Sequence, residues 1–198
     1  RLYIIFHTLY HHVYKLAQLL QQGAQKVPGI DVRLFRVEEQ LPSEVLTKMH
    51  AQPAPDVPVI TANELAKADG FLLGTPTRYG IMSGSMKAFW DTTGGLWASG
   101  ALRGKMAGLF FSTGGQHGGQ ETTALTFITT LAHHGVIFVP MGAHDNLGAI
   151  GEVVGGSYYG AGTVAGADGS RSVSQMESAI ALFQGEQFAD TLLNYVTG

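Results

Sequence analysis

Short runs of consecutive apolar residues recur along the chain, each followed by a polar or glycine-containing turn. Runs without polar alternation are typical of parallel strands that are covered on both faces of a sheet. Four such runs occur, at residues 2–6, 71–73, 106–111 and 136–139, the last ending at Pro140. Residues 31–36 alternate instead, which predicts an outer strand. The pattern therefore predicts five strands.

Between the strands, apolar residues recur three or four positions apart, which is the spacing of amphipathic helices. One predicted helix begins at His12 and ends between residues 23 and 29, and another carries Met86, Phe89 and Trp90. Two more are predicted at residues 121–134 and 173–196. The last has an apolar side formed by Met176, Ile180, Phe183 and Leu192.

The segment from residue 37 to residue 61 is polar and contains four prolines, so it is expected to be a surface loop with at most a short helix from Ser43. Thr61 and Glu64 then have the spacing of a capping box, which predicts a short helix through Leu65 and Ala68.

Strands that alternate with helices in this way imply right-handed crossovers and a parallel five-stranded sheet with helices on both faces. No internal repeat or linker divides the chain, so residues 1–198 are expected to form a single domain. Residues 141–171 contain nine glycines and little periodicity. A connection of this length is expected to be functional or to lie at a subunit contact.

Composition narrows the possible partners. Hydrophobic residues make up 45% of the chain and charged residues 14%, as expected of a folded protein. The formal charge of −3 offers no basic surface for nucleic acid. The absence of cysteine excludes disulfides and thiolate metal sites and is compatible with a cytoplasmic protein. No apolar run is long enough for a transmembrane segment.

The stretch after the run at residues 71–73 carries the clearest candidate chemistry. Pro76 favours an extended Thr75 and ends the strand, while Gly80 lets the backbone turn or approach a flat ligand. With Arg78 and Tyr79, this turn suits a planar polar heterocycle. The alternative for this stretch alone is an ordinary loop between a strand and a helix.

The loop at residues 8–13 joins the first strand to the first helix. Thr8 and the amides of a helix N-terminus favour a phosphate group, although a simple helix cap with two surface histidines is the alternative. His7 and His11 are four residues apart, but they straddle a strand end and a loop, so no metal site is expected. Neither a G-x-G-x-x-G motif after a strand nor an ATP-binding P-loop is present.

Loops that follow the first, third and fourth strands share one edge of a doubly wound sheet, so all three can contact one ligand. A phosphate-binding loop, a turn suited to a flat ring and the glycine-rich stretch from Ser112 to Gln120 together favour FMN.

These residues also carry a family resemblance. The run from Gly74 to Trp90 resembles the WrbA family of NAD(P)H:quinone oxidoreductases, and so do residues 112–114, 118–121 and 130–135. The similarity extends from Tyr3 to residues 165–171. It implies an α/β, flavodoxin-like fold with strand order 2-1-3-4-5, and FMN as the cofactor.

The resemblance also implies roles for individual residues. The phosphate loop would comprise Thr8, Leu9, Tyr10, His11, His12 and Val13, and the ring contacts Pro76, Thr77, Arg78, Tyr79 and Gly80. A second wall would comprise Ser112, Thr113, Gly114, Gly115, Gln116 and His117, with His133. Tyr10 and His133 would assist catalysis, and Trp97 would lie beside the substrate.

Two features depart from the family pattern. His11 occupies a position that is usually glycine, and the wall around His117 is about one residue longer than the common form.

By this resemblance the chain is a two-electron quinone reductase. NADH or NADPH and a quinone would use one face of FMN in turn, in a ping-pong scheme. Homodimers or homotetramers are expected, in the cytoplasm, either free or peripheral at a membrane. The alternatives are a flavodoxin-type electron carrier and a non-catalytic stress or scaffold protein whose FMN binding is weakened at His11.

Overall fold

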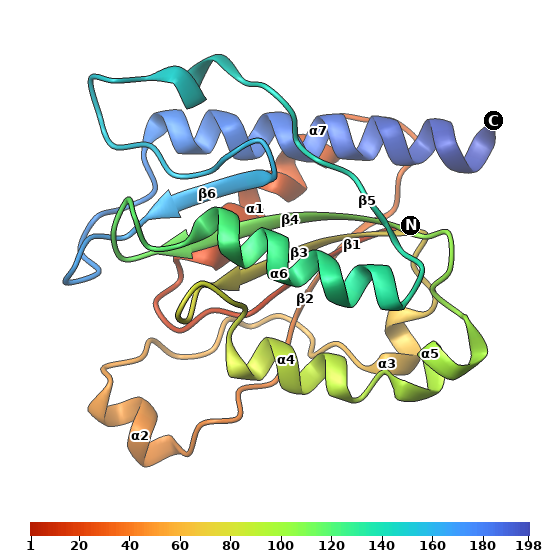
Figure 1. Ribbon diagram of the computed structural model, residues 1–198, viewed down its shortest axis with the longest axis horizontal. Helices are drawn as coiled ribbons and strands as arrows, with labels where there is room; N and C mark the ends of the chain where they lie inside the picture. Colours follow the sequence, from red (N-terminus) through yellow and green to blue (C-terminus); the bar gives the residue numbers. More distant parts are fainter.

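A parallel β-sheet forms the centre of the protein (Figure 1). The computed structural model describes all residues from 1 to 198. Its strands are β1 (Leu2–Phe6), β2 (Val32–Arg36), β3 (Gly70–Pro76), β4 (Met106–Thr113), β5 (Ile137–Phe138) and β6 (Gly160–Val164). The order β2-β1-β3-β4-β5 confirms the predicted flavodoxin-like topology.

The fifth position of the sheet is shared by two short strands. β5 pairs only with Met106 and Ala107, at the start of β4, whereas β6 pairs with β4 from Leu109 to Thr113. The segment at residues 141–171 thus supplies a strand that its sequence does not predict. β6 reads GAGTV, with small residues because a Cβ at Gly160 would lie 1.8 Å from the Leu109 carbonyl oxygen.

No further strand pairs with β6, and its backbone is instead met by buried side chains. The Ala161 amide donates to Gln184 Oε1 at 2.8 Å, and the Val164 amide to Glu177 Oε1 at 3.2 Å. Gln120 Nε2 donates to the Thr163 carbonyl at 3.1 Å. Side chains from two helices thereby satisfy backbone groups that a neighbouring strand would otherwise occupy.

Helices cover both faces of the sheet (Figure 1). α1 (His12–Ala24) and α7 (Gln175–Thr197) pack on one face, with α4 (Gly84–Asp91) and α6 (Gln120–His133) on the other. The shorter helices are α2 (Ser43–Lys48), α3 (Ala62–Leu65), α5 (Gly94–Ser99) and the 3₁₀ helix η1 (Asp145–Gly148). All but α5 and η1 agree with predicted helices.

α1 and α7 pack with their backbones in close contact at two glycines. A Cβ at Gly23 would lie 2.1 Å from the Leu182 carbonyl oxygen, and one at Gly185 would lie 2.1 Å from that of Leu20. Both distances are far below van der Waals contact, so only glycine fits at these crossings. This packing puts Ile180 and Leu192 in the core, but Phe183, predicted on the apolar side, is exposed.

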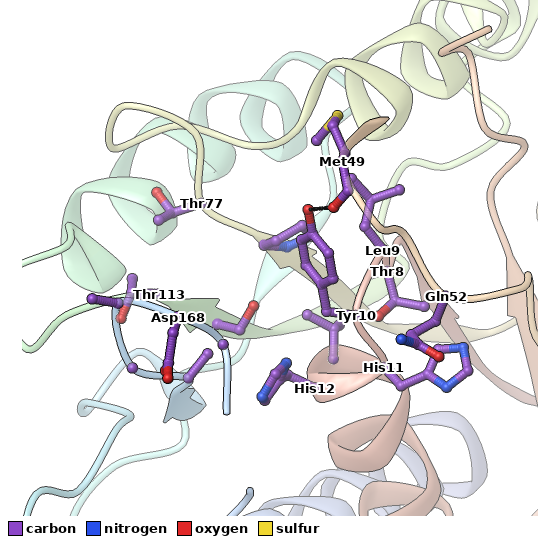
Figure 2. A pocket seen from close by; sticks show the side chains of 18 of the residues that line it. Thr8, Leu9, Tyr10, His11, His12, Met49, Gln52, Thr77, Thr113 and Asp168 are labelled. Atoms are coloured by element: carbon purple, nitrogen blue, oxygen red, sulfur yellow. Dashed lines mark hydrogen bonds between the residues drawn. The ribbon is translucent and has the colours of Figure 1, made fainter. Parts of the chain in front are cut away.

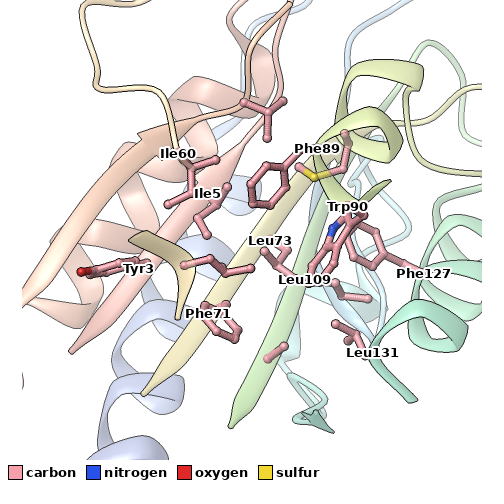
Figure 3. Close-up of a cluster of buried hydrophobic side chains, with 14 of the residues drawn as sticks. Tyr3, Ile5, Ile60, Phe71, Leu73, Phe89, Trp90, Leu109, Phe127 and Leu131 are labelled. Carbon is pink, nitrogen blue, oxygen red and sulfur yellow. The ribbon is translucent and has the colours of Figure 1, made fainter. Parts of the chain in front are cut away.

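The larger of the two hydrophobic clusters lies between the sheet and the α4/α6 layer (Figure 3). Phe71, Leu73 and Leu109 from the strands meet Trp90 and Phe127 from the helices there. Thr61 caps α3 by accepting from the Glu64 amide, but Glu64 turns its carboxylate to the hydroxyl of Tyr3 at 2.8 Å. None of the helices combines the length and the apolarity needed to cross a bilayer.

Candidate functional site

The loops after β1, β3 and β4 meet at the carboxyl edge of the sheet and enclose an open cleft of about 820 Å³ (Figure 2). Parallel strands place their following loops at one edge, which is the usual ligand position in such folds. Of the residues predicted for FMN, twelve line this cleft: Thr8, Leu9, Tyr10, His11, His12, Val13, Pro76, Thr77, Arg78, Ser112, Thr113 and Gly114.

Two further segments line the cleft that sequence reasoning did not assign to it. Met49, His50 and Gln52 follow α2, and residues 165–169 follow β6. Gln52 donates its amide to the Leu9 carbonyl at 2.8 Å, so the first segment is fastened to the phosphate loop. Residues 165–169 belong to a stretch that shares the family resemblance. That resemblance was the only feature of the sequence that pointed to them.

The strongest ligand-binding feature is a row of free amides at the start of α1. Backbone amides of residues 8–14 donate no hydrogen bond within the chain, and α1 has no side-chain N-cap. Free N–H groups and the positive end of the helix dipole together favour an anion. This cradle suits the phosphate of a mononucleotide.

His11 precedes α1 in the left-handed conformation, with φ of 66°. That conformation favours glycine, which gives a physical reason for glycine at the corresponding family position. The imidazole is turned towards Pro53, whose carbonyl oxygen lies 2.8 Å from Nε2, and packs edge-on against Tyr14. Figure 2 shows it beside Gln52 and directed away from Thr113, so it leaves the cleft open.

His12 joins the cradle to the segment after β6. Its Nε2 lies 2.9 Å from the carbonyl oxygen of Arg171, so Nε2 carries the proton of this hydrogen bond. Asp168 is the single acidic residue of the cleft, against Arg78 and three histidines. Hydrogen bonds from the Ser170 amide and hydroxyl lower the pKa of Asp168. The Asp168 carboxylate is therefore bound by a residue of its own loop.

The turn after β3 is a tight reversal from Arg78 to Ile81, closed by hydrogen bonds of 2.8 and 3.1 Å between their backbones. Its central residues, Tyr79 and Gly80, both have positive φ, as in a type I′ turn. Tyr79 is fully exposed and lies outside the cleft lining, as does Gly80. A Cβ at Gly80 would lie 2.7 Å from the Thr122 hydroxyl, so glycine is required there.

Five other predicted site residues lie elsewhere. Gln116 and His117 line a separate, smaller cleft of about 390 Å³, beside the start of α6. Trp97 and His133 are exposed and do not line the large cleft. Gly115 is exposed next to Gly114 without lining either cleft.

The position of His133 follows from the direction of α6. This helix begins beside the cleft at Gln120 and runs back across the sheet for 14 residues, about 20 Å. His133 therefore lies near the start of β4, where the Gly104 amide donates to the Gly135 carbonyl. His133 therefore does not line the cleft of its own chain. α5, the helix that carries Trp97, lies at the same end of the sheet as the last turn of α6 (Figure 1).

Tyr10 is half-exposed over the cleft, and its hydroxyl donates to the Met49 carbonyl at 2.9 Å (Figure 2). This hydrogen bond orients the ring between the phosphate loop and the segment that follows α2. The aromatic ring is therefore available as a wall of the cleft.

A hydrogen-bonded group around Glu39 links the end of β1, the loop after β2 and the start of α4. His7 Nε2 lies 2.7 Å from Glu39 Oε2, and Glu39 Oε1 accepts from the Leu41 amide at 2.9 Å and from the Ser85 hydroxyl at 2.8 Å. Burial alone would raise the pKa of Glu39, but the hydrogen bonds from His7, Leu41 and Ser85 and the attraction of His7 lower it to about 2. Glu39 is therefore an anion that fixes the loop after β2. His11 does not join this group, so the two histidines of the spacing H-x-x-x-H do not face each other.

Comparison with known proteins agrees with this geometry. Residues 12–144 match the family model described as NADPH-dependent FMN reductase. The chain is 53% identical over 193 residues to quinone-oxidoreductase QR2 of Triphysaria versicolor, covering 96% of this chain and 93% of that protein. It is 49% identical over 196 residues to NAD(P)H quinone oxidoreductase PST2 of Candida albicans, with coverage of 98% and 97%.

A solved structure has the same fold at lower identity. A protein of Agrobacterium tumefaciens described as a flavodoxin, WrbA-like protein, superposes with a TM-score of 0.69 at 19% identity, covering 98% of both chains. The family match and the two close relatives extend over most of the chain and agree with the resemblance carried by its motifs. The chain therefore belongs to the NADPH-dependent FMN reductase family.

Proposed function

We propose that this protein is an FMN-dependent NAD(P)H:quinone oxidoreductase. The observation that carries the proposal is the row of free amides at residues 8–14, which opens into the same cleft as the loops after β3 and β4. Relatives at about half identity are named as quinone oxidoreductases, in support of this activity. Bound FMN would supply hydride transfer between NAD(P)H and a quinone, both of them co-substrates of a ping-pong reaction.

The residues of the cleft have separable tasks in this proposal. The amides at the start of α1 and the Thr8 hydroxyl bind the phosphate. Thr77, Arg78, Ser112 and Gly114 border the flat ring. Arg78 has the one permanent positive charge in the lining, so it stabilises negative charge that develops on a reduced ring.

Tyr10, with its hydroxyl held by Met49, forms a wall on which a nicotinamide ring can stack. We assign Tyr79 and Gly80 to the edge of the ring, Gly115, Gln116 and His117 to the outer part of the second wall, and Trp97 and His133 to contacts with quinone.

Because Trp97 and His133 are distant from the cleft of their own chain, their assignment requires a second subunit. We propose a homodimer or homotetramer in which these residues reach the cleft of a neighbour. The absence of cysteine is compatible with the reducing cytoplasm, where we expect the protein to act, either free or at a membrane surface.

The decisive experiment combines an absorption spectrum with turnover. Purified protein titrated with FMN should give the perturbed visible spectrum of a bound flavin. It should then oxidise NADH or NADPH with benzoquinone, without an added reductase. Flavin binding without turnover would indicate an electron carrier instead. A protein that does not take up FMN at micromolar concentration would contradict the proposal.

A further inference from the structure

Arg171 joins three separate segments through partly buried hydrogen bonds. Its guanidinium donates from Nη1 to both carboxylate oxygens of Glu177, at 2.9 and 3.0 Å, and to the Val164 carbonyl at 2.7 Å. Nη2 donates to the Val153 carbonyl at 2.6 Å. The side chain of Arg171 is therefore held by groups from α7, from the end of β6 and from the segment before β6.

Glu177, the partner of Arg171, is completely buried. Besides Arg171, its carboxylate accepts from the amides of Gly155 and Ser174, both at 2.9 Å, and from the Thr163 hydroxyl at 2.8 Å. A buried carboxylate with this many donors is restricted to one geometry, and it restricts its cation in turn. The position of Arg171 is consequently fixed from the interior of the protein.

The backbone of Arg171 transmits this position to the cleft. Its amide donates to the Ala165 carbonyl at 2.9 Å and closes the loop whose residues 165–169 line the cleft. Its carbonyl accepts the Nε2–H of His12, the first residue of α1. Figure 2 places the imidazole of His12 between the start of α1 and the loop that carries Asp168.

We propose that the Arg171–Glu177 ion pair is a positioning device for the phosphate end of the cleft, an inference that rests on the proposed FMN site. The pair holds the Arg171 carbonyl where it fixes His12 with its proton on Nε2. His12 in turn orients the first turn of α1, whose free amides form the cradle. Arg171 and Glu177 are thus positioning residues that act on a phosphate through His12.

Arg171→Lys is the primary test, because lysine keeps the charge opposite Glu177 but cannot maintain all of the guanidinium contacts. Dissociation constants for FMN and for riboflavin, which lacks the phosphate, are measured by flavin fluorescence. The variant should bind FMN about tenfold more weakly, as for the loss of a hydrogen bond to a charged group, with unchanged riboflavin binding. An unchanged ratio of the two constants would overturn the proposal.

A double-mutant cycle with His12→Ala tests the route through His12. If Arg171 acts through His12, the double variant should bind FMN no more weakly than His12→Ala alone. Losses that multiply would show that the two residues act independently, and the proposed route would be wrong.

The matched control is Glu186→Gln, also on α7. It removes an exposed ion pair to Lys26 with the same 2.9 Å separation, away from the cleft, and should leave the ratio of the FMN and riboflavin constants unchanged. A general effect of ion pairs on α7 would change that ratio too, which would contradict a specific role for Arg171.

Nitrogen NMR of His12 needs no flavin and no variant. Near pH 8, where an ordinary histidine is neutral, Nε2 should carry the proton and Nδ1 should be bare. The opposite tautomer would overturn the inference. Wild-type protein that binds neither flavin would instead refute the FMN site, whereas the tautomer would still report on the contact between His12 and Arg171.

Discussion

The carboxylate of Glu39 connects three segments of the chain. It connects the end of β1 through His7, its own loop through the Leu41 amide, and the start of α4 through Ser85. Since these contacts favour the charged form, the pKa of Glu39 falls from an ordinary 4.5 to about 2. The depressed pKa means that the carboxylate stabilises the fold only while it is ionised.

Replacing Glu39 by Gln should therefore give a pH-dependent loss of stability. The ionised group contributes about 3 kcal/mol above pH ~4.5, and this contribution disappears as the pH falls towards ~2. The variant should be less stable than wild type at neutral pH, with the gap closing in acid, as measured by urea unfolding at several pH values. Glu38→Gln, at the exposed neighbouring position, is the control and should show no such gap. A gap independent of pH would contradict the ionic role.

His11 allows a second test at the scale of one residue. Its left-handed backbone disfavours a Cβ, whereas its imidazole bonds to the Pro53 carbonyl. Both His11→Ala and His11→Gly lose that bond, but only alanine retains the backbone strain. The glycine variant should be more stable than the alanine variant by about 1 kcal/mol in urea unfolding, the usual strain of this conformation.

Affinity for FMN should be little changed in His11→Gly, because the imidazole is held at the border of the cleft by the Pro53 carbonyl and is directed away from Thr113. A large loss of affinity in that variant would show that His11 contacts the phosphate directly.

At the scale of elements, the crossing of α1 and α7 depends on the absence of two side chains. Gly185→Ala would place a methyl group 2.1 Å from the Leu20 carbonyl oxygen, so the helices must separate. We expect a loss of about 3 kcal/mol in the free energy of unfolding, the upper range for overpacking. Gly95→Ala on α5 meets nothing within 4 Å and should be neutral or stabilising, because alanine favours helix. Equal effects of the two changes would contradict the packing explanation.

Most elements could be predicted because their buried faces appear in the sequence as regularly spaced apolar residues. The apolar run at residues 2–6 marks β1, and the spacing of Val13, Leu16 and Leu20 marks α1. β6 shows no such spacing, because its neighbours require glycine and its backbone partners are Gln184 and Glu177. Those residues lie on α7 and look like ordinary polar positions of a helix. The missed strand thus reflects contacts that are distant in sequence.

For the whole molecule, the convergence of three loops could be predicted from strand order. The distance to which each helix carries its last residues from the cleft could not. Parallel strands place residues such as Thr8, Thr77 and Ser112 at one edge. His133 lies a helix length away, since α6 runs against the strands. Residues 165–169 reach the cleft only because β6 directs them there. A contact between subunits is harder still to predict from one sequence.

Ligand binding should stabilise the molecule as one cooperative unit. At an FMN concentration of 100 times its dissociation constant, the free energy of unfolding should rise by about 2.7 kcal/mol, because FMN binds only the folded chain. Thermal unfolding followed by circular dichroism measures this rise, and riboflavin at equal concentration should give less. Equal stabilisation by both flavins would show that the amides of residues 8–14 do not hold the phosphate.

The side chains that meet β6 also decide how copies of this chain are able to associate. An unpaired strand edge invites another strand, which leads to continuous sheets and aggregation. Gln184, Gln120 and Glu177 already occupy hydrogen-bonding groups of β6, so this strand is closed to extension. A second copy that approaches β6 therefore meets side chains of helices and not a free row of backbone groups.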